Sequence, residues 1–194
     1  MADFPPALTA AGGTALLVMD VQQGIVSRFA GDPAYLPRLA RAIAAARKAG
    51  LRIVYVTVSF RAGHPEVSPR NKAFGALTQG GGYVTGDAST AVPPAVAPAS
   101  GDILVTKRRV SAFAGSDLEV VLRAGSIETL VLTGIATSGV VLSTLRQAAD
   151  LDYRLVVLAD ACLDQDPEVH RILVEKIFPR QADVLTVDAW VSRL

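Results

Sequence analysis

The sequence has little of several features that would assign a protein class at once. Its single cysteine, Cys162, excludes an internal disulfide, and no Cys/His cluster has zinc-site spacing. Lys and Arg number 19 against 18 Asp and Glu, so no basic surface for nucleic acid is expected. No apolar run approaches the roughly 20 residues that span a bilayer, and Met1–Pro6 lacks signal-peptide character. We expect a cytoplasmic protein that binds neither nucleic acid nor membrane.

What the sequence does contain is an alternation of two kinds of segment, within the 194 residues of an expected single domain, 1–194. Six short apolar runs have the composition of strands buried on both faces: Thr14–Met19, Arg52–Val58, Asp102–Thr106, Thr129–Leu132, Arg154–Leu158 and Asp183–Val187. Stretches with helical spacing lie between most of them: Leu36–Ala49, Ser116–Ala124, Gly139–Asp150 and Pro167–Phe178. The pattern predicts an α/β fold of three layers around a parallel sheet.

The region from Ser59 to Gly101 departs from this alternation. It has no long periodic segment, and it includes the glycine run Gly80–Gly82 and a proline-rich stretch from Val92 to Pro98. Loops this long in a compact domain are usually functional or mobile. An insertion after the second strand is well placed to cover a ligand site, but it would serve equally well as a contact between subunits.

Two charged residues stand where predicted strands end. Asp20 closes the first apolar run, and Lys107 closes the third. Alone, Asp20 is best interpreted as a turn aspartate and Lys107 as a solvated cation. If the strand ends meet at one edge of the sheet, the two side chains can converge, and a partly buried carboxylate beside an ammonium is a tunable acid or base.

Four motifs occur in a fixed order along nearly the whole chain. They are Asp20 with Gln22, Lys107 followed by Ser111-Ala-Phe113, Thr133-Gly-Ile-Ala-Thr137, and Asp160-Ala-Cys162. In this order the sequence resembles the isochorismatase-like hydrolase superfamily. The resemblance implies a mostly parallel, six-stranded Rossmann-like sheet between helices, a homo-oligomer (dimer or tetramer), and catalytic roles for Asp20 and Lys107. It also implies a cis peptide bond between Ile135 and Ala136.

The sequence departs from that family at the nucleophile. Amidase members such as nicotinamidase have a cysteine four residues before a threonine, and counting back from Thr144 places Val140 there. A valine side chain cannot form a thioester, so Val140 replaces the family cysteine and closes the thiolate route. We interpret Cys162 as a small, buried structural residue.

Further residues of the site are predicted from the same resemblance. The nicotinamidase metal motif is replaced by Ser59-Phe-Arg61, and His64 alone is a poor ligand set, so we predict no metal and no cofactor. We interpret His170 as a surface residue. The predicted substrate-binding residues are Gln22, Phe60, Phe74, Ile135, Ala136, Ser138 and Gly139. Backbone N–H groups of residues 138–140 are expected to bind an anionic group.

Three functions remain open from the sequence. The first follows the isochorismatases, which hydrolyse a vinyl ether and can lack the cysteine. By this resemblance Asp20 is the general acid, Lys107 holds and tunes it, and the substrate is a small carboxylated metabolite. The second is an amide or ester hydrolase with a relocated nucleophile, Ser138 or a water activated by Asp20. The third is a non-catalytic protein of the same fold that binds a ligand or a partner.

Overall fold

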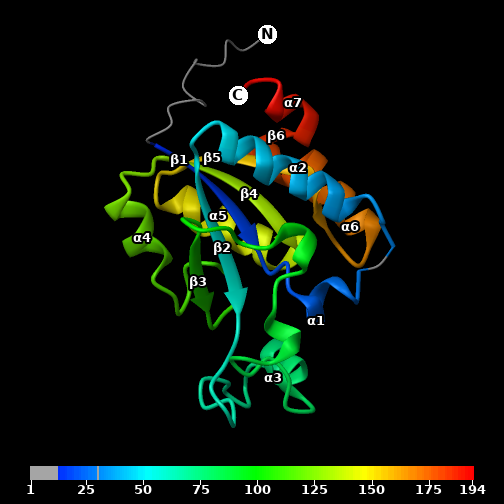
Figure 1. Cartoon of the computed structure of the whole chain (residues 1–194). Coiled ribbons are helices and arrows are strands. Elements are labelled where there is room, and N and C mark those ends of the chain that lie inside the picture. The colour runs from blue at the N-terminus through cyan, green and yellow to red at the C-terminus, as the bar shows by residue number, and fades with distance from the viewer. Residues whose placement is uncertain (1–12, 30) are drawn as a thin grey trace.

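The computed structural model of the chain describes residues 13–29 and 31–194 (Figure 1). Met1–Pro6, on which the signal-peptide expectation depends, lies outside the described residues. The sheet contains β1 (Thr14–Met19), β2 (Arg52–Val58), β3 (Ile103–Lys107), β4 (Thr129–Ile135), β5 (Arg154–Leu163) and β6 (Asp183–Leu185). The strand order is β3-β2-β1-β4-β5-β6, and every neighbouring pair is parallel. The predicted fold class is confirmed.

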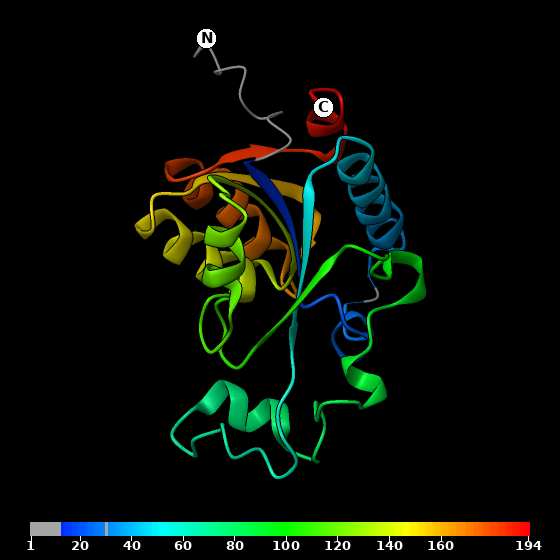
Figure 2. The same ribbon diagram turned by 60° about the vertical axis from the view of Figure 1, so that its left-hand side comes forward.

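Helices cover both faces of this sheet. The α-helices are α1 (Gln23–Val26), α2 (Tyr35–Lys48), α3 (Lys72–Thr78), α4 (Leu118–Ala124), α5 (Leu142–Asp150), α6 (Pro167–Ile172) and α7 (Val187–Val191). Shorter or wider turns are η2 (Ala88–Thr90), η3 (Pro94–Val96), η4 (Thr137–Val141), η5 (Leu173–Ile177) and η6 (Phe178–Arg180). Helix α2 lies with α7 on one face, whereas α4, α5 and the chain from α6 to η6 lie on the other (Figure 2). No helix in the described part of the chain is long and apolar enough to cross a membrane.

The core explains why the apolar runs form strands. No residue of β1 is more than 1% exposed, because the strand lies in the middle of the sheet and both its faces are covered. Alternate residues enter opposite clusters: Leu17 and Met19 pack with α4 and α5, while Leu16 and Val18 pack with α2. Burial of these aliphatic side chains is the main favourable free-energy term for such a sheet, about 1.5–3 kcal/mol for each large one.

The predicted elements are correct in kind, but several end elsewhere. Strands β4 and β5 run three and five residues beyond their predicted ends at Leu132 and Leu158, and their register shifts between Leu132 and Gly134. The predicted helix Gly139–Asp150 begins with η4, inside which Gly139 has non-helical backbone angles, φ −96° and ψ −105°. The predicted helix Pro167–Phe178 is divided into α6 and η5.

The region from Ser59 to Gly101 extends beyond the carboxyl end of β2 and includes α3 (Figures 1 and 2). It has a small core of its own, in which Phe60 and Phe74 meet edge to face with ring centroids 5.7 Å apart. Phe60 also forms a parallel bridge with Val84, so the segment is partly an extension of the sheet. The prediction of a long loop therefore missed a folded substructure.

Candidate active site

The candidate site lies where the strand order reverses. Strands β2 and β3 lie on one side of β1, whereas β4, β5 and β6 lie on the other. Open parallel sheets bind ligands outside the carboxyl ends of the strands at such a point. Asp20 follows β1 directly, the turn from Ala136 to Val140 follows β4, and Lys107 is the last residue of β3. The topology therefore gathers three of the predicted segments at one edge.

A buried ion pair joins two of these strand ends. The Lys107 Nζ atom lies 2.9 Å from Asp20 Oδ2, and the two side chains are 2% and 9% exposed. The Lys107 ammonium also donates a hydrogen bond to the Arg109 carbonyl oxygen at 2.9 Å. Buried charges persist in proteins when they are paired and hydrogen-bonded in this way. The conditional prediction that the two side chains converge is confirmed, and neither is a solvated surface charge.

The environment of Asp20 favours its protonated form. Burial raises the pKa of this carboxyl group above its ordinary value, while the charge and hydrogen bond of Lys107 pull the pKa down less strongly. Oδ2 receives Lys107, but Oδ1 is buried and has no hydrogen-bond partner among the described residues. A proton on Oδ1 would turn this isolated acceptor into a donor. The arrangement therefore shifts Asp20 toward its carboxylic acid form.

The backbone at Asp20 is also unusual. Its φ is +56°, in the left-handed region that few non-glycine residues adopt, although Asp tolerates it better than most. The Asp20 N–H still donates to the Val56 carbonyl at 2.8 Å, which continues the pairing of β1 with β2. The chain thus turns the carboxyl group out of the sheet while its backbone remains anchored.

Gly134, near the end of β4, permits the close approach of β4 to β1. A Cβ atom there would lie 2.1 Å from the Met19 carbonyl oxygen, and the φ of Gly134 is +138°. Any larger residue would push apart the strand ends that position Asp20 and the following turn. The sequence contains this glycine in the Thr133–Thr137 motif, but its packing role was not predicted.

The turn after β4 contains the expected cis peptide bond between Ile135 and Ala136. Two of its N–H groups are already used: Ser138 donates to the Asp164 carboxylate at 2.6 Å, and Gly139 donates to the Ala136 carbonyl at 3.0 Å. The structure therefore corrects the expectation that residues 138–140 jointly offer donors to an anion. Ile135 is buried, whereas Ser138 is exposed and Ala136 and Gly139 are partly buried.

Val140 and Cys162 both lie in the core on the α5 face of the sheet. Val140 is 2% exposed and packs among aliphatic side chains. Cys162 is 2% exposed, and burial raises the pKa of its thiol to about 12, so it is protonated at neutral pH. The prediction that Cys162 is a small buried residue is confirmed.

His170 was predicted to lie on the surface, and this was wrong. Its Nδ1 atom lies 2.8 Å from the Thr137 hydroxyl, and the ring is half-buried because α6 packs against the turn. Burial lowers the pKa of His170, so the ring is neutral at pH 7. No hydrogen bond between His170 and Ser138 is present in the described structure, so the two do not form a nucleophile–base pair. Only the fold brings a helix residue 33 positions away to Thr137.

Three predicted substrate-binding residues have structural partners instead. The Gln22 side chain is fully buried; its Nε2 donates to the carbonyls of Val58 and Thr90, and its Oε1 accepts from the Val58 N–H. Both amide hydrogens are occupied, so Gln22 braces β2 and offers no donor to a substrate. Phe60 and Phe74 are 0% and 5% exposed and pack on each other, so they form a core beneath the segment that contains α3. The predicted role of Phe60 and Phe74 in substrate binding stays a prediction.

Within residues 13–29 and 31–194, no three His, Cys, Asp or Glu side chains cluster closely enough to hold a metal ion. His64 lies in the loop after β2, where its Nε2 atom is 2.8 Å from the Gly82 carbonyl oxygen. Arg61 forms an ion pair with Glu66. The side chains of His64 and Arg61 therefore form contacts within this loop.

The site is thus a buried carboxyl–ammonium pair at the switch point of a three-layer α/β fold. The isochorismatase domain family matches residues 14–189, and the chain belongs to this family. It is 34% identical over 182 residues to the isochorismatase family protein YwoC of Bacillus subtilis, covering 93% of this chain and 94% of that one. It is 33% identical over 217 residues to the ureidoacrylate amidohydrolase RutB of Stutzerimonas stutzeri, covering 96% and 82%.

Solved structures of family members have the same fold. An isochorismatase family protein from Burkholderia thailandensis superposes with a TM-score of 0.79 at 28% identity, covering 98% of this chain and 97% of that one. N-carbamoylsarcosine amidase from Thermoplasma acidophilum superposes with a TM-score of 0.73 at 26% identity, covering 91% and 97%. The protein is an isochorismatase-family hydrolase.

Proposed function

We propose that this hydrolase cleaves a small carboxylated metabolite by acid catalysis at Asp20, without a cysteine nucleophile. Hydrolysis of a vinyl ether, as in the isochorismatases that the sequence resembles, is the leading reaction. The observation that supports this most strongly is the buried Asp20 carboxyl group, with Oδ2 on Lys107 and Oδ1 unpartnered. An acid that must stay protonated near neutral pH needs this kind of environment.

The proposed reaction begins with proton transfer from Asp20 Oδ1 to the terminal carbon of the vinyl ether. The double-bond electrons form the new C–H bond, and the positive charge is shared between the ether-bearing carbon and its oxygen. Water adds to that carbon, and the proton lost by the water returns to Asp20. The resulting hemiketal then breaks the C–O bond to the former ether oxygen, and its hydroxyl proton passes to that oxygen, which releases an alcohol and pyruvate.

Lys107 has a defined part in this proposal. Its ammonium lies 2.9 Å from Oδ2 and stabilises the carboxylate that forms when Asp20 gives up its proton. The ammonium is held independently by the Arg109 carbonyl, so it does not have to move during the reaction. Preorganised charge of this kind avoids reorganisation at the moment of proton transfer.

Two residues are the reason that the proposed reaction uses no thiol. Val140 occupies the position that the family resemblance assigns to the nucleophile, and the only cysteine of the chain is Cys162. The Cys162 thiol has a raised pKa of about 12, and its Sγ atom is directed at the Leu132 carbonyl, 3.9 Å away. Such a thiol is a poor nucleophile because almost none of it is thiolate at neutral pH.

The test is hydrolysis of isochorismate in D₂O, with the released pyruvate trapped at once as lactate. Carbon protonation by Asp20 predicts one solvent-derived deuterium on the methyl group. Asp20→Asn should lower kcat by at least about 100-fold, the usual contribution of a general acid. Arg180→Gln, at an exposed arginine, should turn over within about twofold of the wild type. Full turnover by Asp20→Asn, or pyruvate without deuterium, would refute the mechanism.

A second candidate is amide hydrolysis by a water activated by Asp20. It is favoured by the names of the similar proteins, a ureidoacrylate amidohydrolase and an N-carbamoylsarcosine amidase. Ammonia release from ureidoacrylate or N-carbamoylsarcosine, with no pyruvate from isochorismate, would replace the leading proposal with this one. Loss of ammonia release in Ser138→Ala would assign the nucleophile to Ser138 and exclude an Asp20-activated water.

We also propose that the protein is a homo-oligomer, a dimer or a tetramer, as the family resemblance implies. Light scattering coupled to size-exclusion chromatography measures its mass directly against the 20.3 kDa of one chain. A mass of one chain at micromolar concentration would contradict this.

A further inference from the structure

A pocket lies beside the turn that follows β4. Its volume is about 320 Å³, within the usual range for small-molecule sites. It is formed by residues 28, 29, 31 and 32 and by the loop from β5 into α6. Its lining residues are Arg28, Phe29, Gly31, Asp32, Cys162, Leu163, Asp164, Gln165, Pro167 and His170. Neither Asp20 nor Lys107 lines this pocket.

The acidic residues of this pocket are already engaged. Asp32 pairs with Arg38, a residue that also donates to the Asp160 carbonyl. Asp164 accepts hydrogen bonds from the N–H groups of Ser138 and Gln165. Asp32 is therefore neutralised by Arg38, whereas Asp164 is hydrogen-bonded and forms no ion pair within the described residues.

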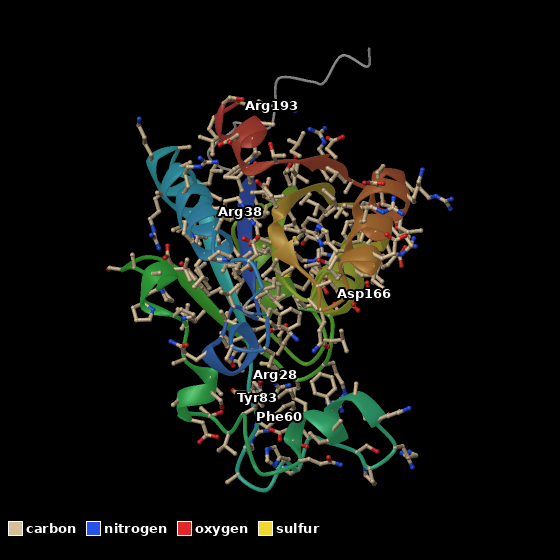
Figure 3. The ribbon with its side chains drawn as sticks, turned by 90° about the vertical axis from the view of Figure 1, so that its right-hand side faces the viewer. Arg28, Arg38, Phe60, Tyr83, Asp166 and Arg193 are labelled. Carbon is tan, nitrogen blue, oxygen red and sulfur yellow. The ribbon has the colours of Figure 1, made fainter. Side chains whose placement is uncertain are left out.

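Arg28 is in the opposite situation. It forms no ion pair within the described residues, and its guanidinium carbon lies 5.7 Å from the centre of the Tyr83 ring. The Tyr83 hydroxyl donates to the Gly24 carbonyl at 2.9 Å, so the ring under Arg28 is fixed. Figure 3 shows Arg28 directly above Tyr83 and Phe60, between the sheet and the segment that contains α3. A guanidinium held on an aromatic face keeps its fork of N–H donors available for a planar anion.

His170 supplies a second, neutral polar group. Its Nδ1 atom is occupied by the Thr137 hydroxyl, and its Nε2 atom makes no hydrogen bond to the described residues. Phe29, Leu163 and Pro167 supply an apolar surface between these polar groups. One uncompensated cation, one free ring nitrogen and apolar walls together match a ligand with a single carboxylate on an apolar body.

We propose that this pocket binds a small monocarboxylate with an apolar body, whose carboxylate pairs with Arg28 and whose body contacts Phe29, Leu163 and Pro167. This binding site is distinct from the reaction proposed at Asp20 and does not depend on it. A ligand here also touches Asp164 and His170, the side chains that hold Ser138 and Thr137. Binding of a ligand is therefore expected to change the environment of the turn after β4.

The test uses benzoate as the probe and benzamide as its neutral counterpart, each titrated into ¹⁵N-labelled protein and followed by NMR. Benzoate should give saturable shifts of the amides at residues 28–32 and 163–170 and of the Ser138 amide. Benzamide should bind at least tenfold more weakly. Arg28→Gln should weaken benzoate at least tenfold, whereas Arg180→Gln, at an exposed arginine remote from the pocket, should leave it within twofold.

Asp20→Asn separates this site from the proposed active site. It should leave benzoate affinity within twofold of the wild type, even where it abolishes turnover. The proposal is overturned if Arg28→Gln binds benzoate as tightly as the wild type does. It is also overturned if the saturable shifts are confined to residues next to Asp20 and Lys107, or if Asp20→Asn weakens benzoate tenfold while Arg28→Gln does not.

Discussion

Two neighbouring regions at the carboxyl edge of the sheet hold their polar groups in different ways. Asp20 and Lys107 come from strand ends and meet in the interior, where Lys107 Nζ contacts Asp20 Oδ2. The turn of residues 137–140 is held from outside, by Asp164 on a loop and His170 on α6. The first region depends on burial and pairing, so breaking it leaves a buried polar group without its partner. The second depends on partly exposed contacts whose loss water can replace.

The largest effect concerns the glycine that brings β4 against β1. Gly134→Ala places a methyl group at the Met19 carbonyl and forces a left-handed φ on alanine. We expect a loss of about 3 kcal/mol or more in the free energy of unfolding. Gly75→Ala in α3 meets no atom within 4 Å and should be neutral or slightly stabilising by comparison. Equal effects at the two glycines would contradict the packing role of Gly134.

The next effect should follow from breaking the buried pair. Lys107→Met removes the ammonium but keeps a long apolar side chain, and leaves Asp20 buried without a partner. We expect the free energy of unfolding to fall by about 1–3 kcal/mol, the usual cost of a buried polar group that loses its partner, measured by urea denaturation. Arg171→Ala, which removes an exposed arginine paired with Glu168 and Glu175, should cost less than about 1 kcal/mol.

The double variant Lys107→Met/Asp20→Asn is a stricter test of this prediction, because it removes both ionisable groups. It should regain a large part of the stability lost in Lys107→Met alone. If Lys107→Met costs no more than Arg171→Ala, the pair is not the buried unit described above.

A smaller effect is expected at the turn. Asp164→Ala removes the acceptor of the Ser138 N–H, and water can take its place because Ser138 is exposed. The stability cost should be about 1 kcal/mol. Amide hydrogen exchange at Ser138 should accelerate while exchange in the middle of β1 stays unchanged. Unaltered exchange at Ser138 would show that Asp164 does not hold the turn in solution.

The pH dependence compares the pair with and without its ammonium. Because burial raises the pKa of Asp20 above its unfolded value, the stability from this group is present at low pH and lost as pH rises through the folded pKa. As a general acid, Asp20 gives a kcat/KM that falls over the same pH window. Lys107→Met removes the opposing influence, so the falling limb should move to higher pH. A limb that stays in place or moves lower would argue against Asp20 as the titrating acid.

The contrast between the two regions also explains what the sequence could predict. Strands β1 and β2 begin and end at the predicted residues, because continuous apolar runs and abrupt polar ends mark them clearly. The same signal placed Asp20 and Lys107 at one edge, and the ordered motifs supplied the cis bond at Ile135–Ala136.

Contacts made across loops could not be predicted in this way. The partners of His170 and Asp164 are 33 and 26 residues away, and no local pattern links them. Gln22 was assigned to the substrate because its motif lies beside Asp20, yet its amide is used by the backbone of β2 and of Thr90. Arg28 gave no signal at all, because its placement over Tyr83 depends on how the segment between β2 and β3 folds back.

The central claim is that the chemistry depends on Asp20 and not on a thiol. The most direct measurement is the kcat/KM for isochorismate of Cys162→Ala and Asp20→Asn, prepared and assayed side by side. The account predicts that Cys162→Ala, which removes the only cysteine of the chain, stays within about twofold of the wild type, whereas Asp20→Asn loses at least about 100-fold. An inactive, folded Cys162→Ala, or an Asp20→Asn enzyme with full turnover, would contradict it.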